Sequence, residues 1–270
     1  MAATASCPAY LTGLFLIGDK DAVGAGFSID KSITTTVSER KGGRTTITLN
    51  GVEGALPVSK SVLRRFTEKG CRMGLLDIQH ATEVPVGFGL GMSAAGALSL
   101  TLALNELLGA GLSREECIKI AHDADVECGT GLSGADAAAI GGMLARRSPS
   151  EPLAVLPFEE KGLEIAFYTP IKTSSVINSP DWKKRVNAAG SEALGALFGN
   201  RGWDGFVAAS RQFAQKSGLA DWCVHEMGSN PRASMAMLGH TLFSDIPMFL
   251  PRKPFMLMKA KTAQGGAMLL

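Results

Sequence analysis

The feature that most constrains the fold is a stretch without charged side chains, residues 84–105. Its length alone is typical of a helix that crosses a membrane. However, it contains Pro85 and three glycines at alternate positions in residues 87–91, and these residue types break helices. The remainder that can form a continuous helix, residues 92–104, would be about 20 Å long, shorter than a hydrocarbon core of ~30 Å. The stretch therefore predicts a glycine-rich loop that leads into a buried helix of a soluble protein.

Composition excludes several other classes of protein. The chain has 270 residues, with 27 Lys and Arg against 25 Asp and Glu, and a formal charge of +2. With 46% apolar residues, it can bury a sizeable core. The near-neutral charge favours neither nucleic acid nor an anionic membrane as a partner. The five cysteines show no C-x-x-C spacing, which argues against a disulfide scaffold and a zinc site. Because the N-terminus does not resemble a signal peptide, we expect a cytoplasmic location.

The order of strand-like and helix-like segments predicts an α+β fold in two parts. There is no regular βαβ alternation, which argues against a doubly wound sheet. Ser113 and Glu116 form a capping-box pattern, which predicts the start of a helix. The composition changes at residues 146–152 (RRSPSEP), so we predict domains 1–148 and 149–270. Strands are expected at residues 26–39, 45–49, 75–83, 163–168 and 255–261, and helices at 61–70, 92–108, 113–128, 135–140, from 179, and at 205–216.

The strongest functional signal is the string Pro85-Val86-Gly87-Phe88-Gly89-Leu90-Gly91-Met92-Ser93-Ala94-Ala95. Alternate glycines let the backbone fold tightly and expose its N–H groups. The helix that follows adds free N–H groups and the positive end of its dipole at the same point. The small side chains after Met92 allow a ligand to approach closely. The string therefore predicts a phosphate-binding nest, although it is neither a P-loop nor G-x-G-x-x-G.

This string resembles the phosphate-binding motif P-x-x-x-G-L-G-S-S-A-A of the GHMP kinase superfamily, with Met92 in place of the first serine. Residues 8–15 (PAYLTGLF) resemble the first motif of the superfamily, and residues 237–243 (MLGHTLF) resemble its third. With VGAGFSIDK and AHDADVECGTGL, the resemblance extends over nearly the whole chain and is strongest to the archaeal pantoate kinases. It implies the GHMP kinase fold, with an N-terminal β-α-β nucleotide-binding part and a smaller, ferredoxin-like α+β C-terminal part.

The resemblance implies an enzyme that uses ATP and Mg²⁺ to phosphorylate pantoate to 4-phosphopantoate, on the archaeal route to coenzyme A. The nucleotide contacts that it implies are Pro85, Gly87, Phe88, Gly89, Leu90, Gly91, Met92, Ser93, Ala94, Ala95 and Gly239. A kinase for homoserine, shikimate or mevalonate is an alternative, because the loop motifs bind only ATP. A non-catalytic homologue is another, since Met92 departs from the motif and Asp136 is displaced from the spacing that relatives usually show. No nucleic-acid or membrane partner is implied, and relatives are commonly homodimers.

The resemblance also assigns catalytic and metal-binding roles. Asp136, in Ser133-Gly134-Ala135-Asp136, matches the superfamily pattern S-G-x-D and is the implied general base. Aligned instead from Gly141-Gly142, the base position falls on Gly134, and Asp136 is then only an acid at a helix start. Asp125 is the implied magnesium carboxylate, with Ser93 as the hydroxyl ligand. Glu127 is the second candidate for the magnesium carboxylate. In the alternative interpretation, the acidic residues of this helix form a solvated face and bind no metal.

The carboxylate of pantoate requires a cation. Arg232, just before the third motif, is one candidate because arginine pairs with a carboxylate through two hydrogen bonds. Lys31, after a glycine-rich turn, is the second candidate. Both have the alternative of being ordinary surface residues. Thr12 and Ser28 are the candidates for hydrogen bonds to the substrate hydroxyls.

Overall fold

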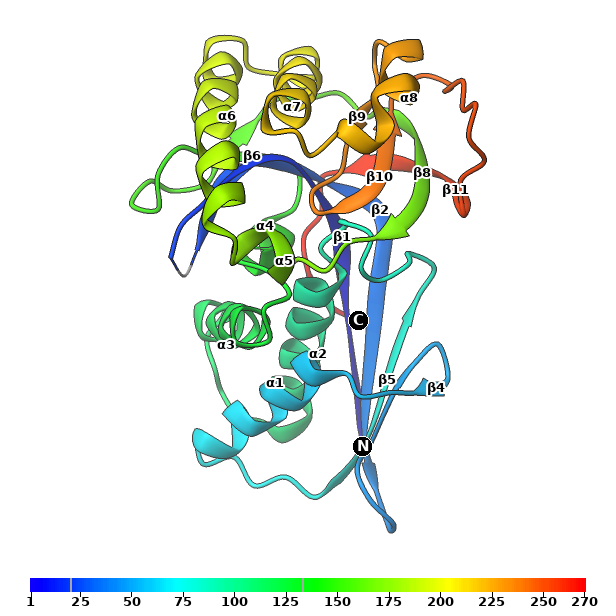
Figure 1. Ribbon diagram of the computed structural model, residues 1–270. Coiled ribbons are helices and arrows are strands. Elements are labelled where there is room, and N and C mark those ends of the chain that lie inside the picture. Colours follow the sequence, from blue (N-terminus) through cyan, green and yellow to red (C-terminus); the bar gives the residue numbers. More distant parts are fainter. Residues whose placement is uncertain (20, 133) are drawn as a thin grey trace.

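The computed structural model describes residues 1–19, 21–132 and 134–270. Two long strands form its spine, β1 (Ala2–Ile17) and β2 (Ala22–Arg40) (Figure 1). They pair antiparallel along nearly their whole length, with register shifts near Pro8 and near Thr12. Most residues of β1 are buried, because helices cover it as well as its neighbouring strands.

The remaining strands extend this spine into one mixed sheet with the path β4-β3-β5-β2-β11-β8-β10-β9. β1 and β6 each pair with β2, β12 pairs with β1, and β7 pairs with β6. Among the described strands only β3 and β5 pair in parallel, which agrees with the predicted α+β class. The bounds are β3 (Thr46–Leu49), β4 (Val52–Glu53), β5 (Leu75–Thr82), β6 (Met143–Arg146), β7 (Ala154–Leu156), β8 (Gly162–Pro170), β9 (Ser234–Met235), β10 (Gly239–Ser244), β11 (Met256–Ala263) and β12 (Met268–Leu269).

The helices form two groups, α1–α4 beside the lower part of the sheet in Figure 1 and α6–α8 above. α2 packs against β1, β2 and α3, whereas α6 and α7 pack against each other and on β1. The bounds are α1 (Pro57–Glu68), α2 (Met92–Leu108), α3 (Arg114–Glu127), α4 (Gly134–Ile140), α5 (Ser174–Ile177), α6 (Pro180–Gly199), α7 (Trp203–Ser217), a 3₁₀ turn η1 (Asp221–Cys223) and α8 (Val224–Ser229).

The helix predicted after the glycine-rich loop is confirmed as α2. It is buried from Met92 to Leu104 except at Ser93, because nearly all of its side chains are small or apolar. The capping box of α3 is also confirmed, with both reciprocal hydrogen bonds between Ser113 and Glu116. α1 begins at Pro57, earlier than predicted. Among the described residues, no helix combines the length and the apolar character that a membrane crossing requires.

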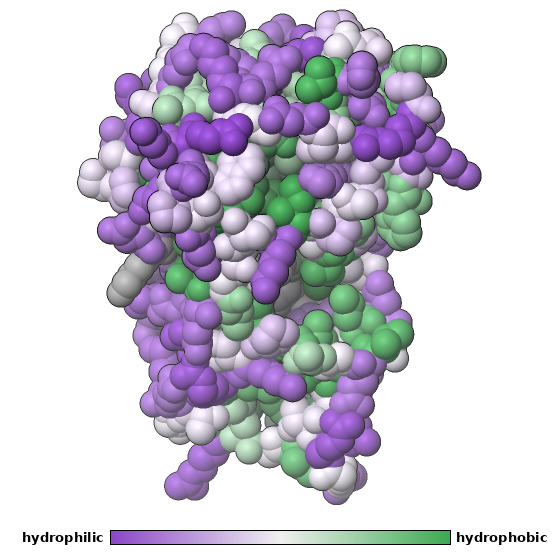
Figure 2. Space-filling model, viewed as in Figure 1, coloured by the Kyte–Doolittle hydropathy of each residue, from purple (hydrophilic) through white to green (hydrophobic). Residues whose placement is uncertain are grey.

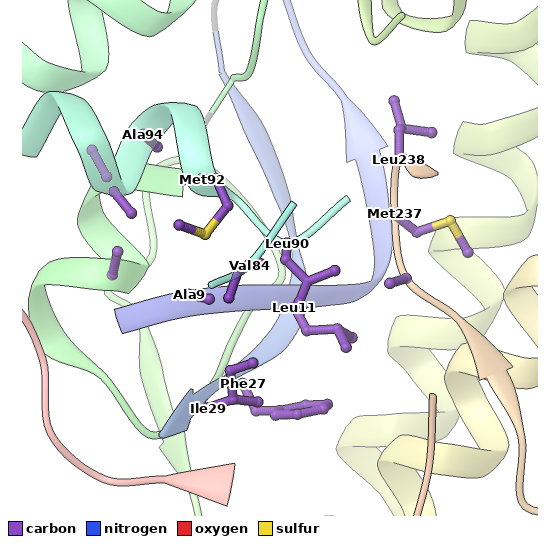
Figure 3. Packing of buried hydrophobic residues seen from close by; sticks show 14 of the residues in the cluster. Ala9, Leu11, Phe27, Ile29, Val84, Leu90, Met92, Ala94, Met237 and Leu238 are labelled. Atoms are coloured by element: carbon purple, nitrogen blue, oxygen red, sulfur yellow. The ribbon is translucent and has the colours of Figure 1, made fainter. Parts of the chain in front are cut away.

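Hydrogen-bonded strand pairs cross the predicted domain boundary. β11 pairs with both β2 and β8, and β12 returns to pair with β1. The division at residue 148 therefore stays a prediction, within a sheet that is continuous across it. One hydrophobic core joins both parts and lies directly under the glycine-rich loop (Figure 3). Its members there are Ala9, Leu11, Phe27, Ile29, Val84, Leu90, Met92, Ala94, Met237 and Leu238.

Candidate active site

A cavity of about 340 Å³ lies between the glycine-rich loop, the start of α2 and the end of α3. Figure 2 shows a hollow in the middle of one face of the molecule, where hydrophobic side chains gather. Five segments that are far apart in sequence meet around the cavity. They include residues 10–15, 86–94, 125–132, 171–177 and 237–238, and Ala22 and Gly134 also line the cavity.

The glycine-rich loop has the backbone conformation that its sequence predicts. Gly87, Gly89 and Gly91 have φ values of 90°, 86° and 65°, in the left-handed region that favours glycine. Gly91 is the N-cap of α2 and supplies no side-chain cap. Within the described part of the chain no side chain caps the first N–H groups of α2, which leaves them available to a ligand, and Met92, Ser93 and Ala94 line the cavity. This is the geometry of a phosphate site.

Four of the expected nucleotide contacts, Pro85, Phe88, Ala95 and Gly239, are absent from the cavity lining. The hydroxyl of Thr241 donates a hydrogen bond of 2.8 Å to the carbonyl of Phe88. A Cβ atom at Gly239 would lie 2.1 Å from the carbonyl carbon of Phe88, so only glycine fits there. The third motif therefore supports the loop from behind.

Asp125 brings a carboxylate into the cavity wall. Its residue is 3% exposed, and the hydroxyl of Thr130 donates a hydrogen bond to its Oδ1. Burial raises the pKa of Asp125 to about 6, while the bond from Thr130 acts in the opposite direction. A Cβ atom at Gly131 would lie 2.1 Å from Oδ2, so glycine leaves the space that this oxygen occupies.

The oxygen donors fit a magnesium ion. The described residues hold no cluster of three or more His, Cys, Asp or Glu side chains that would bind a metal by themselves. Mg²⁺ commonly takes only one or two protein carboxylates and completes its shell with phosphate oxygens and water. Asp125 and Ser93 both line the cavity and offer a carboxylate and a hydroxyl. The chemistry of this pair suits Mg²⁺ bound together with a nucleotide.

The fallback ligand Glu127 points to a different part of the molecule. It is exposed, accepts a hydrogen bond of 2.8 Å from Ser61 and pairs with Arg64 and Arg65 of α1. These contacts hold the pKa of Glu127 below its ordinary value. The alternative of an outward acidic face is therefore correct for Glu127, whereas Asp125 faces inward.

Asp136 lies in the first turn of α4. The cavity lining includes Gly134 of this helix but not Asp136. Ser133 of the S-G-x-D match lies outside the described residues. The geometry gives Asp136 no contact with the cavity, and its role as general base stays a prediction.

The two predicted substrate cations are engaged elsewhere, so neither reaches the cavity. The Nζ of Lys31 lies 2.8 Å from a carboxylate oxygen of Glu83. Arg232 donates a 2.8 Å hydrogen bond to Asp245, and its Nη1 lies 2.7 Å from Asp204. The hydrogen bond to Asp245 is the main reason why the pKa of Arg232 is raised. The structure places both side chains outside the cavity lining, beside acidic partners, and their role as substrate cations stays a prediction.

Of the two predicted hydroxyl ligands, one lies at the cavity and the other does not. Thr12 lines the cavity, and its carbonyl accepts a hydrogen bond of 2.9 Å from the backbone of Met237. Ser28 is fully buried outside the lining, and its hydroxyl has no hydrogen-bond partner among the described residues. Sequence reasoning missed Lys172, which lines the cavity just after β8. It lies four residues after the predicted strand 163–168, and no motif of the sequence marks it.

The comparisons with known proteins agree with this arrangement. Residues 57–143 match the GHMP kinases N terminal domain. The chain is 30% identical over 249 residues to a pantoate kinase of Methanocaldococcus jannaschii, a match that covers 87% of this chain and 90% of the relative. It is 29% identical over 255 residues to a pantoate kinase of Methanospirillum hungatei, covering 89% and 86%.

Solved structures share the fold. A phosphotransferase related to the CoA biosynthesis pathway matches 100% of this chain with 98% of its own, with a TM-score of 0.84 at 21% identity. The mevalonate diphosphate decarboxylase of Enterococcus faecalis matches with a TM-score of 0.70 at 13% identity, covering 100% and 99%. The chain has the GHMP kinase fold and belongs to the pantoate kinase family.

Proposed function

We propose that this protein transfers the γ-phosphoryl group of ATP to the 4-hydroxyl group of pantoate, forming 4-phosphopantoate and ADP. The observation that carries the proposal is a free helix N-terminus that opens on a cavity with one buried carboxylate. The 30% identity to a pantoate kinase over 87% of the chain supplies the acceptor. The same proposal places the reaction on the archaeal route to coenzyme A, in the cytoplasm, and in a homodimer.

The loop and α2 bind the nucleotide. The backbone N–H groups of residues 87–94 and the helix dipole attract the phosphates, which carry most of the charge of ATP. Mg²⁺, held by Asp125 and Ser93, would neutralise part of the phosphate charge during transfer. Asp125, whose pKa burial has raised, would act as a metal ligand in its ionised form.

The cavity also suits the acceptor. Pantoate carries two methyl groups on one carbon, a feature that homoserine and shikimate do not have. Apolar side chains of Phe15, Leu132 and Ile177 line the cavity and provide a surface for these methyl groups. Thr12, also in the lining, offers a hydrogen bond to a substrate hydroxyl.

Phosphoryl transfer depends only weakly on a general base. Most analyses describe a loose transition state, for which positioning and charge neutralisation supply nearly all of the catalysis. The assignment of Asp136 as the base is therefore tested separately. If Asp136 accepts the hydroxyl proton, Asp136→Asn should lower turnover by at least ~100-fold while ATP binding is retained. Near-wild-type turnover would remove Asp136 from this role.

The acceptor is tested by incubating the purified protein with Mg²⁺ and ATP plus pantoate, homoserine, shikimate or mevalonate, each separately, and following ADP release. We expect release with pantoate and a background rate with the other three. Release with another acceptor would identify a different small-molecule kinase of the superfamily. Release with none would contradict the catalytic proposal and favour a non-catalytic homologue. Asp125→Asn, assayed with pantoate over a range of Mg²⁺ concentrations, should need more metal if Asp125 is a ligand.

A further inference from the structure

The cavity contains very little charge. Among the described side chains that line it, Asp125 carries the only carboxylate and Lys172 the only positive charge. The substrates that we propose carry several negative charges, on the triphosphate and on the carboxylate. Free N–H groups offer only partial charges, so a full positive charge at this site has a large effect. Lys172 is the side chain that can supply it.

Lys172 belongs to a short segment, residues 171–174, that crosses one side of the cavity. At one end, the backbone N–H of Ile171 donates a hydrogen bond of 3.2 Å to the carbonyl of Gly87, at the start of the glycine-rich loop. At the other end, a Cβ atom at Gly129 would lie 3.7 Å from the Cβ of Ser174. The segment therefore links the two glycine-rich turns, and Lys172 follows the residue that is bonded to the phosphate loop.

Lys172 is also available for a ligand. Within residues 1–19, 21–132 and 134–270, no ion pair is found for Lys172, whereas Lys31 and Arg232 both have acidic partners. The residue is exposed at the cavity, so its flexible side chain can reach toward a bound anion. An unpaired lysine beside a nest of backbone N–H groups resembles, in its chemistry, other phosphate sites in which lysine acts as a point charge.

We propose that Lys172 binds the phosphates of ATP beside the glycine-rich loop. This inference rests on the proposed kinase function and identifies the cation for its nucleotide. Phosphate is favoured over the pantoate carboxylate because the hydrogen bond between Ile171 and Gly87 ties this segment to the nucleotide loop. Lys172 thereby binds and orients the phosphoryl donor by direct contact.

The test compares Lys172→Met with Lys184→Met, a matched exchange of an exposed lysine on α6 outside the cavity lining. The affinity for a fluorescent ATP analogue is titrated with Mg²⁺ and without pantoate, and KM values for ATP and pantoate are measured. Lys172→Met should weaken nucleotide binding by about 10-fold or more, the low end for a lost charge-assisted hydrogen bond. Lys184→Met should bind like the wild type. Lys172→Arg should restore most of the affinity, because it keeps the positive charge.

Unchanged nucleotide affinity in Lys172→Met would overturn the proposal. If only the KM for pantoate rises, Lys172 binds the acceptor carboxylate instead, which also overturns it. Melting curves confirm that each variant is folded. Because nucleotide binding is measured without an acceptor, the result does not depend on which acceptor is phosphorylated. A wild-type protein that binds the analogue but phosphorylates no acceptor would refute the proposed function alone.

Discussion

Acidification should destabilise this protein through one buried histidine, His80 of β5. The residue is 3% exposed, and its two ring nitrogens lie 2.8 Å from the hydroxyl of Thr35 and 3.0 Å from that of Ser59. Thr35 in turn lies 2.6 Å from the hydroxyl of Ser99 in α2. This polar network joins β2, β5, α1 and α2. Burial lowers the pKa of His80 from 6.5 to about 4, because the charged ring would lose its hydration.

The sign and size of the effect follow from this pKa. The folded state binds the proton less tightly than the unfolded state, so the stability is fully present above pH 6.5 and is lost as the pH falls toward 4. A difference of about 2.5 pH units at ~1.4 kcal/mol each corresponds to a total loss of ~3.4 kcal/mol. Between pH 7.5 and 4.5 the loss is ~2.5 kcal/mol, a large fraction of the usual ~5–15 kcal/mol of stability.

Urea denaturation of the wild type and of His80→Gln, measured from pH 7.5 to 4.5, isolates this contribution. The variant does not titrate at this position, and the other ionisable groups are common to both proteins. The stability difference between them should therefore shift in favour of the variant by ~2.5 kcal/mol as the pH falls. Equal activity at pH 7.5 would show that the variant keeps its fold. A shift below ~1 kcal/mol would refute a buried, neutral His80.

Three substitutions test other parts of the structure. Gly131→Ala places a Cβ atom 2.1 Å from Oδ2 of Asp125 and displaces this carboxylate. Turnover should therefore fall by at least ~100-fold while the melting temperature stays near that of the wild type, and a fully active variant would show that Asp125 takes no part in the reaction. Gly239→Ala forces the third motif away from Phe88, so calorimetric titration should show weakened nucleotide binding. A wild-type affinity would contradict the inference that the third motif supports the glycine-rich loop. Arg232→Met leaves Asp245 without its main partner, so the free energy of unfolding measured with urea should fall by ~2–3 kcal/mol while the KM for pantoate stays unchanged. A raised KM for pantoate would indicate that Arg232 binds the substrate.

The conformation of the glycine-rich loop was predictable from sequence because its determinants are local. Three alternate glycines permit the positive φ values that are observed, and the apolar residues after Gly91 form a helix whose start needs no distant partner. The capping box of α3 was predictable for the same reason. The wider resemblance to GHMP kinases identified the fold because it rests on several motifs in a consistent order.

For the acidic residues of α3, the local sequence does not determine which side chain faces the cavity. Residues two positions apart in a helix point in nearly opposite directions, so Asp125 and Glu127 cannot both face the cavity. The sequence does not say which side is inward, since that depends on where α1 and the loop after α3 pack. Arg64 and Arg65 attract Glu127 outward, and Thr130 binds Asp125 inside.

The sequence by itself determined the conformation of the glycine-rich loop, the buried helix behind it and the family, all of which depend on the chemistry of contiguous residues. Only the tertiary structure decided which cation lines the cavity. In the sequence, Lys31 and Arg232 were candidates for the substrate carboxylate. In the fold they form ion pairs with Glu83, Asp204 and Asp245. Lys172 belongs to no motif and reaches the site only because β8 ends beside the glycine-rich loop. Charge pairing acts through space, and the distances through space are set by the packing of the whole chain.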